Sequence, residues 1–256
     1  MARGWHHDAH MKRSHGTTDD ADVDRVLRVY ADRSARRLGR RYAAHRPEVI
    51  LAAHQVERLL LTKLGARGWT DFDRLEVLDV GCGAGGPLVR LISHGVRPTS
   101  AHGIDLRERA IGVARSRLPS ADLRVGNAAE LPYADGSMDL VLQFTMLSSI
   151  LDAALRAKVA REMSRVLRPG GLIVSYDFRI NPLNRETRGL ARRELRALFP
   201  GHGIEARTVT LAPPIARLVA PRSYGIAAAL QALVPLRTHL LAFITPPEPP
   251  GWPRRR

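Results

Sequence analysis

The sequence contains little cysteine and no long hydrophobic run. Cys82 is the only cysteine, so an intramolecular disulfide and a cysteine-rich zinc module are both excluded, and a reducing compartment is the expected setting. No uninterrupted apolar stretch approaches the ~18 residues of a spanning helix. The first 20 residues carry four histidines where a signal peptide would need an apolar stretch. We therefore expect a cytoplasmic protein without a membrane anchor.

Aromatic residues and lysines are also scarce, although the chain is strongly basic. The chain has 40 Lys+Arg against 25 Asp+Glu, a formal net charge of +15, yet only three of the basic residues are lysines and aromatics make up 5%. The nucleotide bias of a GC-rich genome can produce such an arginine excess without a polyanionic partner, so the charge alone does not indicate one. Nucleic-acid binding favours basic residues interleaved with aromatics that stack on bases. The arginine clusters at 33–41 and 185–196 are therefore interpreted as solvated or substrate-facing surfaces, and nucleic-acid binding is not expected.

Length and composition predict one globular domain. With 256 residues, 45% of them hydrophobic, the chain can bury a sufficient core without a disulfide or structural metal. The histidines of the N-terminal arm lack partners that would orient them, so no metal site is expected. The expected parts are a flexible arm at 1–20, a single domain at 21–245 and a Pro/Arg-rich tail at 246–256. Within the domain we expect a helical cap at 21–70 and a core at 71–245 that contains an insertion at 213–235.

Strand and helix signals alternate through most of the domain. The expected strands are 77–80, 101–104, 123–125, 140–144 and 172–178, and the expected helices are 87–94, 108–118, one from 152 that includes 166, and 186–199. This alternation predicts a parallel sheet with helices on both faces. Two further strands, 204–211 and 239–245, have no regular crossover helix between them, which predicts an antiparallel closing pair. The expected fold class is α/β, a Rossmann-like and mainly parallel seven-stranded sheet with an antiparallel final strand.

A glycine-rich turn follows the first expected strand, in the sequence VLDVGCGAGG at 77–86. Gly81, Gly83 and Gly86 satisfy the dinucleotide fingerprint, whereas Gly81, Gly83 and Gly85 satisfy the G-x-G-x-G loop of S-adenosylmethionine enzymes. The carboxylate of Asp79 would repel a pyrophosphate but attract a sulfonium nucleoside that carries an ammonium group. The charge therefore favours the sulfonium ligand over NAD.

Four motifs agree in order and spacing with one family. They occupy residues 78–85, 103–106, 126–133 and 165–171. Over residues 77–178 the chain resembles the class I S-adenosylmethionine-dependent methyltransferases, of the methyltransferase type 11-like group. The resemblance implies an enzyme that uses S-adenosylmethionine as its cofactor.

The resemblance also implies roles for single residues. Asp105 should hold the ribose hydroxyls, the glycine loop should approach the methionyl part, and Asn127 with Ala128 should meet the adenine edge. The family more often has aspartate at the position of Asn127, but an amide oxygen can also accept from the adenine amino group. The expected cofactor-binding residues are Asp79, Gly81, Gly83, Gly85, Asp105, Leu106, Asn127, Ala128, Gln143 and Phe144.

The acceptor is expected to be a small molecule. The Asn/Asp-Pro-Pro-aromatic run of enzymes that methylate nucleobase amino groups is absent after the fourth strand, where the chain reads QFTM at 143–146. Cys82 lies inside the cofactor loop and is not placed to attack a pyrimidine. The leading hypothesis is methyl transfer to oxygen or nitrogen of a specialised metabolite or glycan precursor. The alternatives are an RNA methyltransferase and a non-methylating S-adenosylmethionine-binding protein or cyclase on the same fold.

The residues that act on the acceptor are less well indicated. Many family members have histidine where this chain has Ser148 and Ser149, so the motifs do not identify a base. In the family, helices before the core and the insertion before the last strand usually build the acceptor pocket. The catalytic candidates are Tyr30, His45 and Asp177, and the substrate-binding candidates are Ser148, Arg179, Asn181 and Tyr224. A homodimer is left open.

Overall fold

The structure is a computed structural model that describes residues 18–35, 43–181, 184 and 186–247. Most of the expected arm, including its four histidines, and residues 248–256 of the expected tail lie outside these residues. Within the described residues, no helix is both long enough and apolar enough to cross a membrane.

The core is one seven-stranded sheet in the order β3-β2-β1-β4-β5-β7-β6. Strands β1 to β5 pair in parallel, and β7 runs antiparallel to both of its neighbours, β5 and β6. The expected mainly parallel sheet with an antiparallel final strand is therefore confirmed. The strands are β1 Val77–Val80, β2 Ala101–Asp105, β3 Asp122–Val125, β4 Met138–Phe144, β5 Leu167–Phe178, β6 Gly203–Leu211 and β7 Arg237–Thr245.

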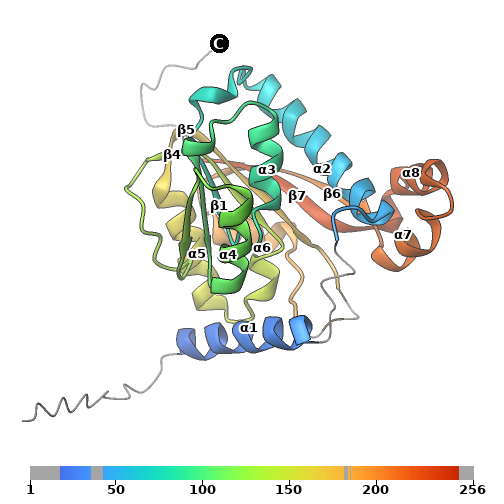
Figure 1. Cartoon of the computed structure of the whole chain (residues 1–256), viewed down its shortest axis with the longest axis horizontal. Helices are drawn as coiled ribbons and strands as arrows, with labels where there is room; N and C mark the ends of the chain where they lie inside the picture. The colour runs from blue at the N-terminus through green and yellow to red at the C-terminus, as the bar shows by residue number, and fades with distance from the viewer. Residues whose placement is uncertain (1–17, 36–42, 182–183, 185, 248–256) are drawn as a thin grey trace, which may run out of the picture.

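Helices cover both faces of the sheet (Figure 1). The α-helices are α1 Thr18–Ala35, α2 Pro47–Ala66, α3 Gly86–Ser93, α4 Glu108–Arg117, α5 Ala153–Val166, α6 Arg192–Leu198, α7 Pro213–Val219 and α8 Tyr224–Ala232. Side chains of α2, α3 and α4 share one buried cluster with Leu142 and Leu241, whereas α5 and α6 share another with Val141 and Leu240. Adjacent residues of one strand thus pack against helices on opposite faces of the sheet, because side chains alternate along a strand.

Helix α5 shows why the pattern of the sequence could be interpreted directly. Asp152 caps its N-terminus, with the carboxylate accepting a hydrogen bond from Leu155 N at 2.7 Å. The apolar residues at helical spacing, Leu155, Val159, Met163 and Val166, are all buried with at most 3% exposure. The helix expected from 152 is confirmed, and this buried stripe fixes α5 against the sheet.

Two expected elements have different limits. The helix expected at 186–199 is limited to α6, because Arg188 N and Leu190 N donate to Ser148 O and Phe178 O instead of to helical carbonyls. Strand β5 begins at Leu167, ahead of the expected start at 172. Its pairing passes from Leu167 to Leu172 with a register shift on β4, so residues 168–171 form a bulge within the strand.

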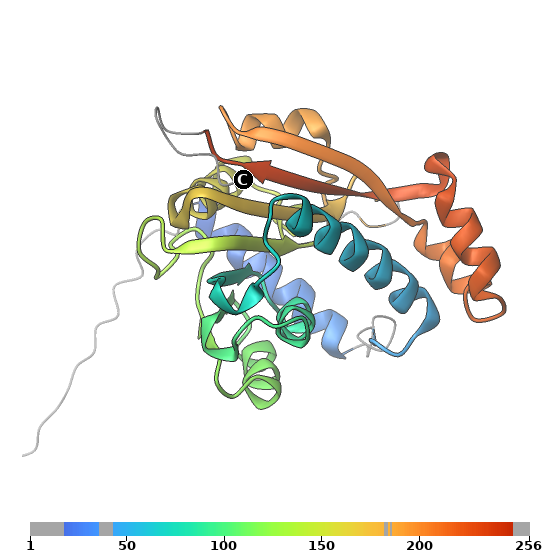
Figure 2. The ribbon, with the colours of Figure 1, turned by 90° about the horizontal axis from the view of Figure 1, so that it is seen from above.

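Helix α1 lies across the edge at which the parallel strands end (Figure 1). The Asp22 carboxylate accepts from Leu151 N at 2.9 Å, and Arg25 Nη2 donates to Ser149 O at 2.5 Å. Both contacts are made to the segment that follows β4. Helices α7 and α8 lie together at one end of the β6 and β7 pair (Figure 2). The loops after the parallel strands are thus enclosed by elements from both ends of the domain.

Candidate functional site

One cavity of about 930 Å³ opens at the carboxyl edge of the parallel strands. In open α/β sheets this edge is the usual ligand site. We distinguish two parts by the elements that line them. The glycine-loop half is lined by Asp79, by residues 81–83, 104–107 and 126–128, and by Phe144. The chamber is lined by Glu48, Val49, Ala52, Ala53 and Val56 of α2, by Tyr176 and Phe178 of β5, by Thr210, Leu211, Pro213, Ala216 and Arg217, and by His239.

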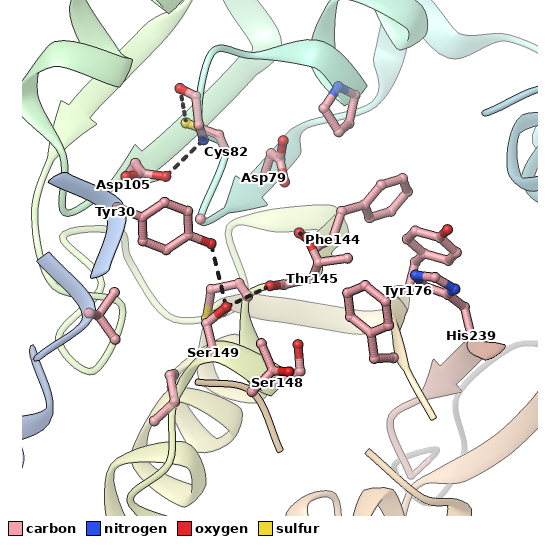
Figure 3. Close-up of a pocket in the computed structure, with 18 of the residues that line it drawn as sticks. Tyr30, Asp79, Cys82, Asp105, Phe144, Thr145, Ser148, Ser149, Tyr176 and His239 are labelled. Carbon is pink, nitrogen blue, oxygen red and sulfur yellow. Dashed lines mark hydrogen bonds between the residues drawn. The ribbon is translucent and has the colours of Figure 1, made fainter. Parts of the chain in front are cut away.

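Asp79 is a buried carboxylate in the glycine-loop half (Figure 3). It is 1% exposed, and neither carboxylate oxygen has a hydrogen-bond partner among the described residues. Burial, together with the nearby negative charge of Asp105, raises the pKa of Asp79 to about 8. An unpaired carboxylate at this position is stabilised by a cationic ligand and destabilised by an anionic one. The site therefore fits the ammonium and sulfonium groups of S-adenosylmethionine and not a pyrophosphate.

The glycine loop brings its backbone close to its neighbours. Gly81 has φ +75°, and a Cβ there would lie 2.6 Å from Met146 Cγ. Gly83 has φ +54°, and a Cβ there would lie 3.3 Å from the Arg107 guanidinium. Both positions favour glycine for conformation, and Gly81 does so for space as well. Gly85 has a different role, because it precedes α3 in the left-handed conformation and does not line the cavity.

Asp105 ends β2 and is 6% exposed. Its carboxylate accepts from Gly83 N at 2.8 Å and from Arg107 N, Nε and Nη2 at 2.9, 2.8 and 2.9 Å. The Arg107 guanidinium in turn stacks on the ring of Tyr30 at 4.2 Å. The acid expected to hold ribose hydroxyls is thus at the cavity, but an arginine that the sequence motif did not single out now engages it. The signal was available, since Arg107 lies two residues after the motif acid.

The remaining cofactor candidates divide into lining and supporting residues. Leu106, Asn127, Ala128 and Phe144 line the cavity. Asn127 Oδ1 accepts from Ala129 N at 3.0 Å and keeps a second lone pair. Gln143 is fully buried and does not line the cavity, because its Oε1 accepts from Met146 N and Leu147 N at 3.2 Å each. Gln143 thus supports the turn after β4 and is not part of the cavity lining.

The catalytic candidates lie in three different settings. Tyr30 lines the cavity, and its hydroxyl lies 3.4 Å from Ser149 Oγ. His45 is exposed and does not line the cavity. Asp177 is fully buried outside the cavity lining and accepts from Ser148 N and Phe178 N at 2.9 and 2.8 Å. Burial raises the pKa of Asp177 to about 6. Its contacts hold the turn that carries Ser148.

Two of the substrate-binding candidates meet at the cavity and two do not. Ser148 and Asn181 line it, and the buried Ser148 Oγ has no hydrogen-bond partner among the described residues. Arg179 Nη2 donates to Arg237 O at 3.3 Å outside the lining. Tyr224 is 42% exposed, and its hydroxyl lies 3.2 Å from His54 Nδ1. Arg179 and Tyr224 therefore have no contact with the cavity in this structure.

Sequence reasoning missed two ionisable residues of the chamber. Glu48 of α2 is 7% exposed, its Oε2 has no hydrogen-bond partner among the described residues, and its Oε1 accepts from Arg46 Nε at 2.8 Å. His239 of β7 is 4% exposed and lies between the rings of Tyr176 and Phe178. The only signal for His239 was a polar residue at the start of an apolar strand.

Comparison with known proteins agrees with the geometry. Residues 77–171 match the model of a methyltransferase domain. A probable S-adenosylmethionine-dependent methyltransferase of Mycolicibacterium smegmatis is 37% identical over 141 residues, which cover 51% of this chain and 52% of the relative. The 27-O-demethylrifamycin SV methyltransferase of Amycolatopsis mediterranei is 36% identical over 43% of this chain and 40% of its own length. The chain thus spans about half the length, or less, of these curated relatives.

Solved structures share the fold at low sequence identity. The magnesium protoporphyrin IX methyltransferase of Synechocystis, solved with bound S-adenosylmethionine, has a TM-score of 0.60 at 15% identity, covering 88% of this chain and 97% of that one. The cyclase SpnF has a TM-score of 0.53 at 21% identity, covering 74% and 80%. Residues 77–171 therefore match a methyltransferase domain, and the motifs and sheet order around them are similar to those of class I S-adenosylmethionine-dependent methyltransferases.

Proposed function

We propose that this protein transfers a methyl group from S-adenosylmethionine to an oxygen or nitrogen atom of a small molecule, a specialised metabolite or glycan precursor, in the cytoplasm. The observation that carries the proposal is the unpaired, buried carboxylate of Asp79 in a cavity that continues from the glycine loop into a separate chamber. The cation-binding half suits the methyl donor, and the adjacent apolar half suits an organic acceptor.

The residues of the glycine-loop half supply complementary contacts for the cofactor. Asp79 is placed to compensate its positive charge, and Asp105 can accept from ribose hydroxyls once the Arg107 side chain moves away. Leu106 and Ala128 provide apolar surface for the base. When bound, S-adenosylmethionine supplies an electrophilic methyl group, so the protein's main task is to align the acceptor and exclude water. Helix α1, held by Asp22 and Arg25, closes this half against solvent.

The chamber favours a small acceptor over a polymer. Its walls include Val49, Ala52, Leu211, Pro213 and Ala216, which are apolar. Helices α1, α2 and α7 all contribute to the lining, so a nucleic-acid strand would have to displace several elements to reach the glycine loop. The rifamycin relative is named as a methyltransferase of a specialised metabolite, which is consistent with an acceptor of this class.

The test is a binding and turnover experiment on the purified chain. We expect calorimetry to show uptake of S-adenosylmethionine and S-adenosylhomocysteine and none of NADH. We then expect radiolabelled methyl transfer to members of a small-molecule acceptor library, with one S-adenosylhomocysteine formed per methylated product. Transfer to RNA with no transfer to small acceptors would replace the proposal by the RNA alternative. Binding without conversion to S-adenosylhomocysteine, while an acceptor is rearranged, would indicate a cyclase.

A further inference from the structure

His239 lies where the topology places acceptor-binding groups. Strand β7 is antiparallel to β5, so its first residues lie at the same edge as the last residues of the parallel strands. His239 is the register partner of Phe178 on one side and of Val209 on the other. Its side chain is 4% exposed and lines the chamber.

His239 belongs to a row of rings along this edge. Phe144 lies 5.5 Å from Tyr176, Tyr176 stacks on His239 at 5.0 Å with an interplanar angle of 7°, and His239 lies 4.1 Å from Phe178. The Tyr176 hydroxyl is engaged with Thr210 Oγ1 at 2.9 Å. The row therefore offers an apolar wall, and the imidazole is its only ring with nitrogen atoms (Figure 3).

The imidazole has one nitrogen in use and one available. Nδ1 lies 3.1 Å from Thr238 Oγ1, whereas Nε2 has no hydrogen-bond partner within the described residues. When Nδ1 donates to the threonine hydroxyl, Nε2 carries the lone pair. Burial lowers the pKa of His239 to about 3, so the ring is neutral under physiological conditions and that lone pair can accept a hydrogen bond.

Building on the proposed function, we propose that the chamber takes an apolar molecule that presents a hydroxyl group, and that His239 is the catalytic base for its O-methylation. The acceptor oxygen forms a bond to the methyl carbon as the carbon–sulfur bond breaks, and the sulfur keeps that electron pair. The hydroxyl proton moves to His239 Nε2 and later to solvent. The products are a methyl ether and S-adenosylhomocysteine.

The proton transfer is favourable although burial weakens this base. A neutral imidazole remains far more basic than the oxygen of a hydroxyl that is being alkylated, so the transfer is driven as the new bond forms. The other candidates are less suitable. Asp177 does not reach the cavity, and the hydroxyls of Ser148 and Tyr30 are poor bases. Glu48 also lines the chamber and is the competitor, although its Oε1 already accepts from Arg46 Nε.

The experiment pairs 2-naphthol with naphthalene as probes of the S-adenosylhomocysteine-saturated protein. We expect wild-type protein to bind 2-naphthol about tenfold more tightly than naphthalene, because a buried hydrogen bond is worth about 1 kcal/mol or slightly more. We expect H239F to lose this preference while retaining its affinity for S-adenosylhomocysteine. H94Q is the control, since His94 is paired with Glu57 outside the cavity lining.

Turnover provides the second readout. With S-adenosylmethionine and 2-naphthol we expect H239Q to lower kcat by about 100-fold or more with little change in KM, as general-base catalysis contributes about 10²–10⁴-fold. We expect added imidazole to restore part of the rate in H239A. If E48Q shows this loss instead of H239Q, or if wild-type protein binds both probes equally, the assignment is overturned. Absence of S-adenosylhomocysteine binding in wild-type protein would instead overturn the proposed function itself.

Discussion

The Arg107 guanidinium donates two hydrogen bonds to the carboxylate of Asp105. Arg107 Nε donates to Oδ1 at 2.8 Å and Nη2 donates to Oδ2 at 2.9 Å, while the backbone amides of Arg107 and Gly83 take one further position on each oxygen. A carboxylate has about four acceptor positions. All are therefore in use, and ribose hydroxyls can bond to Asp105 only if the arginine side chain moves away.

This competition leads to a prediction for R107M. The substitution removes the guanidinium but keeps an apolar side chain against Tyr30, so we expect S-adenosylhomocysteine to bind about three- to tenfold more tightly. Isothermal titration calorimetry measures the change. R109M is the matched control, since Arg109 is exposed in the first turn of α4, the helix that Arg107 precedes. Weaker binding by R107M would show that the guanidinium orients Asp105 for the ribose.

Ionisation of Asp79 predicts a pH dependence of cofactor binding. The free protein holds this carboxyl with a pKa of about 8, so it is protonated at lower pH, and a cation binds best to its ionised form. We expect the affinity for S-adenosylmethionine, relative to that of D79N, to rise about tenfold per pH unit from pH 6 towards 8 and then to level off. Calorimetry of both proteins across this range tests the ratio, and parallel pH profiles would contradict it.

The same substitution affects stability in a defined direction. The pKa of Asp79 is higher in the folded protein than the ordinary aspartate value of 3.8, so its ionisation opposes folding increasingly as pH rises from about 4 to 8. D79N cannot ionise. We therefore expect its unliganded Tm to exceed that of wild type by several degrees at pH 8, with a smaller difference at pH 5. Thermal unfolding at the two pH values measures this, and an equal difference at both would argue against the shifted pKa.

Attachment of α1 depends on Asp22. Its carboxylate accepts from Leu151 N and Asp152 N at 2.9 and 3.3 Å and from Arg25 Nε at 2.6 Å. We expect D22A to release α1, to lower the affinity for S-adenosylhomocysteine about fivefold, and to speed proteolysis within α1. Limited proteolysis with and without the ligand tests this, with D24A as the control for loss of an acid on the same helix. Equal cleavage of the two variants would show that Asp22 does not hold the helix.

Glu194 is predicted to matter for stability. The Arg156 side chain is only 1% exposed. It forms an ion pair with Glu194, and its Nε donates to Ile150 O at 3.1 Å. E194A would leave this buried cation with less compensation, and we expect a loss of about 2 kcal/mol in the free energy of unfolding, because Glu194 itself is partly exposed. Urea denaturation measures the loss. E130A, at an exposed site, should change the free energy by less than about 0.5 kcal/mol.

Local patterns in the chain were sufficient for the order of its elements. The glycine turn at 81–85, the acid at Asp105 and the stripe of α5 each depend on residues close in sequence, so their structure could be predicted from spacing. The length of the helix expected at 186–199 could not be predicted in this way. Its backbone donors bond to Ser148 and Phe178, which are distant in sequence, and these contacts exist only after the chain has folded.

The sequence by itself therefore determined the sheet, the glycine loop and the position of an acid at Asp79, because period, conformation and residue type are properties of short segments. Only the tertiary structure decided which side chains meet in the chamber. His239 stacks on the ring of Tyr176 because β7 inserts antiparallel between β5 and β6. The Arg107 guanidinium contacts the ring of Tyr30 because α1 crosses the ends of the strands. Both contacts join residues separated by more than sixty positions, and no local pattern specifies such a meeting.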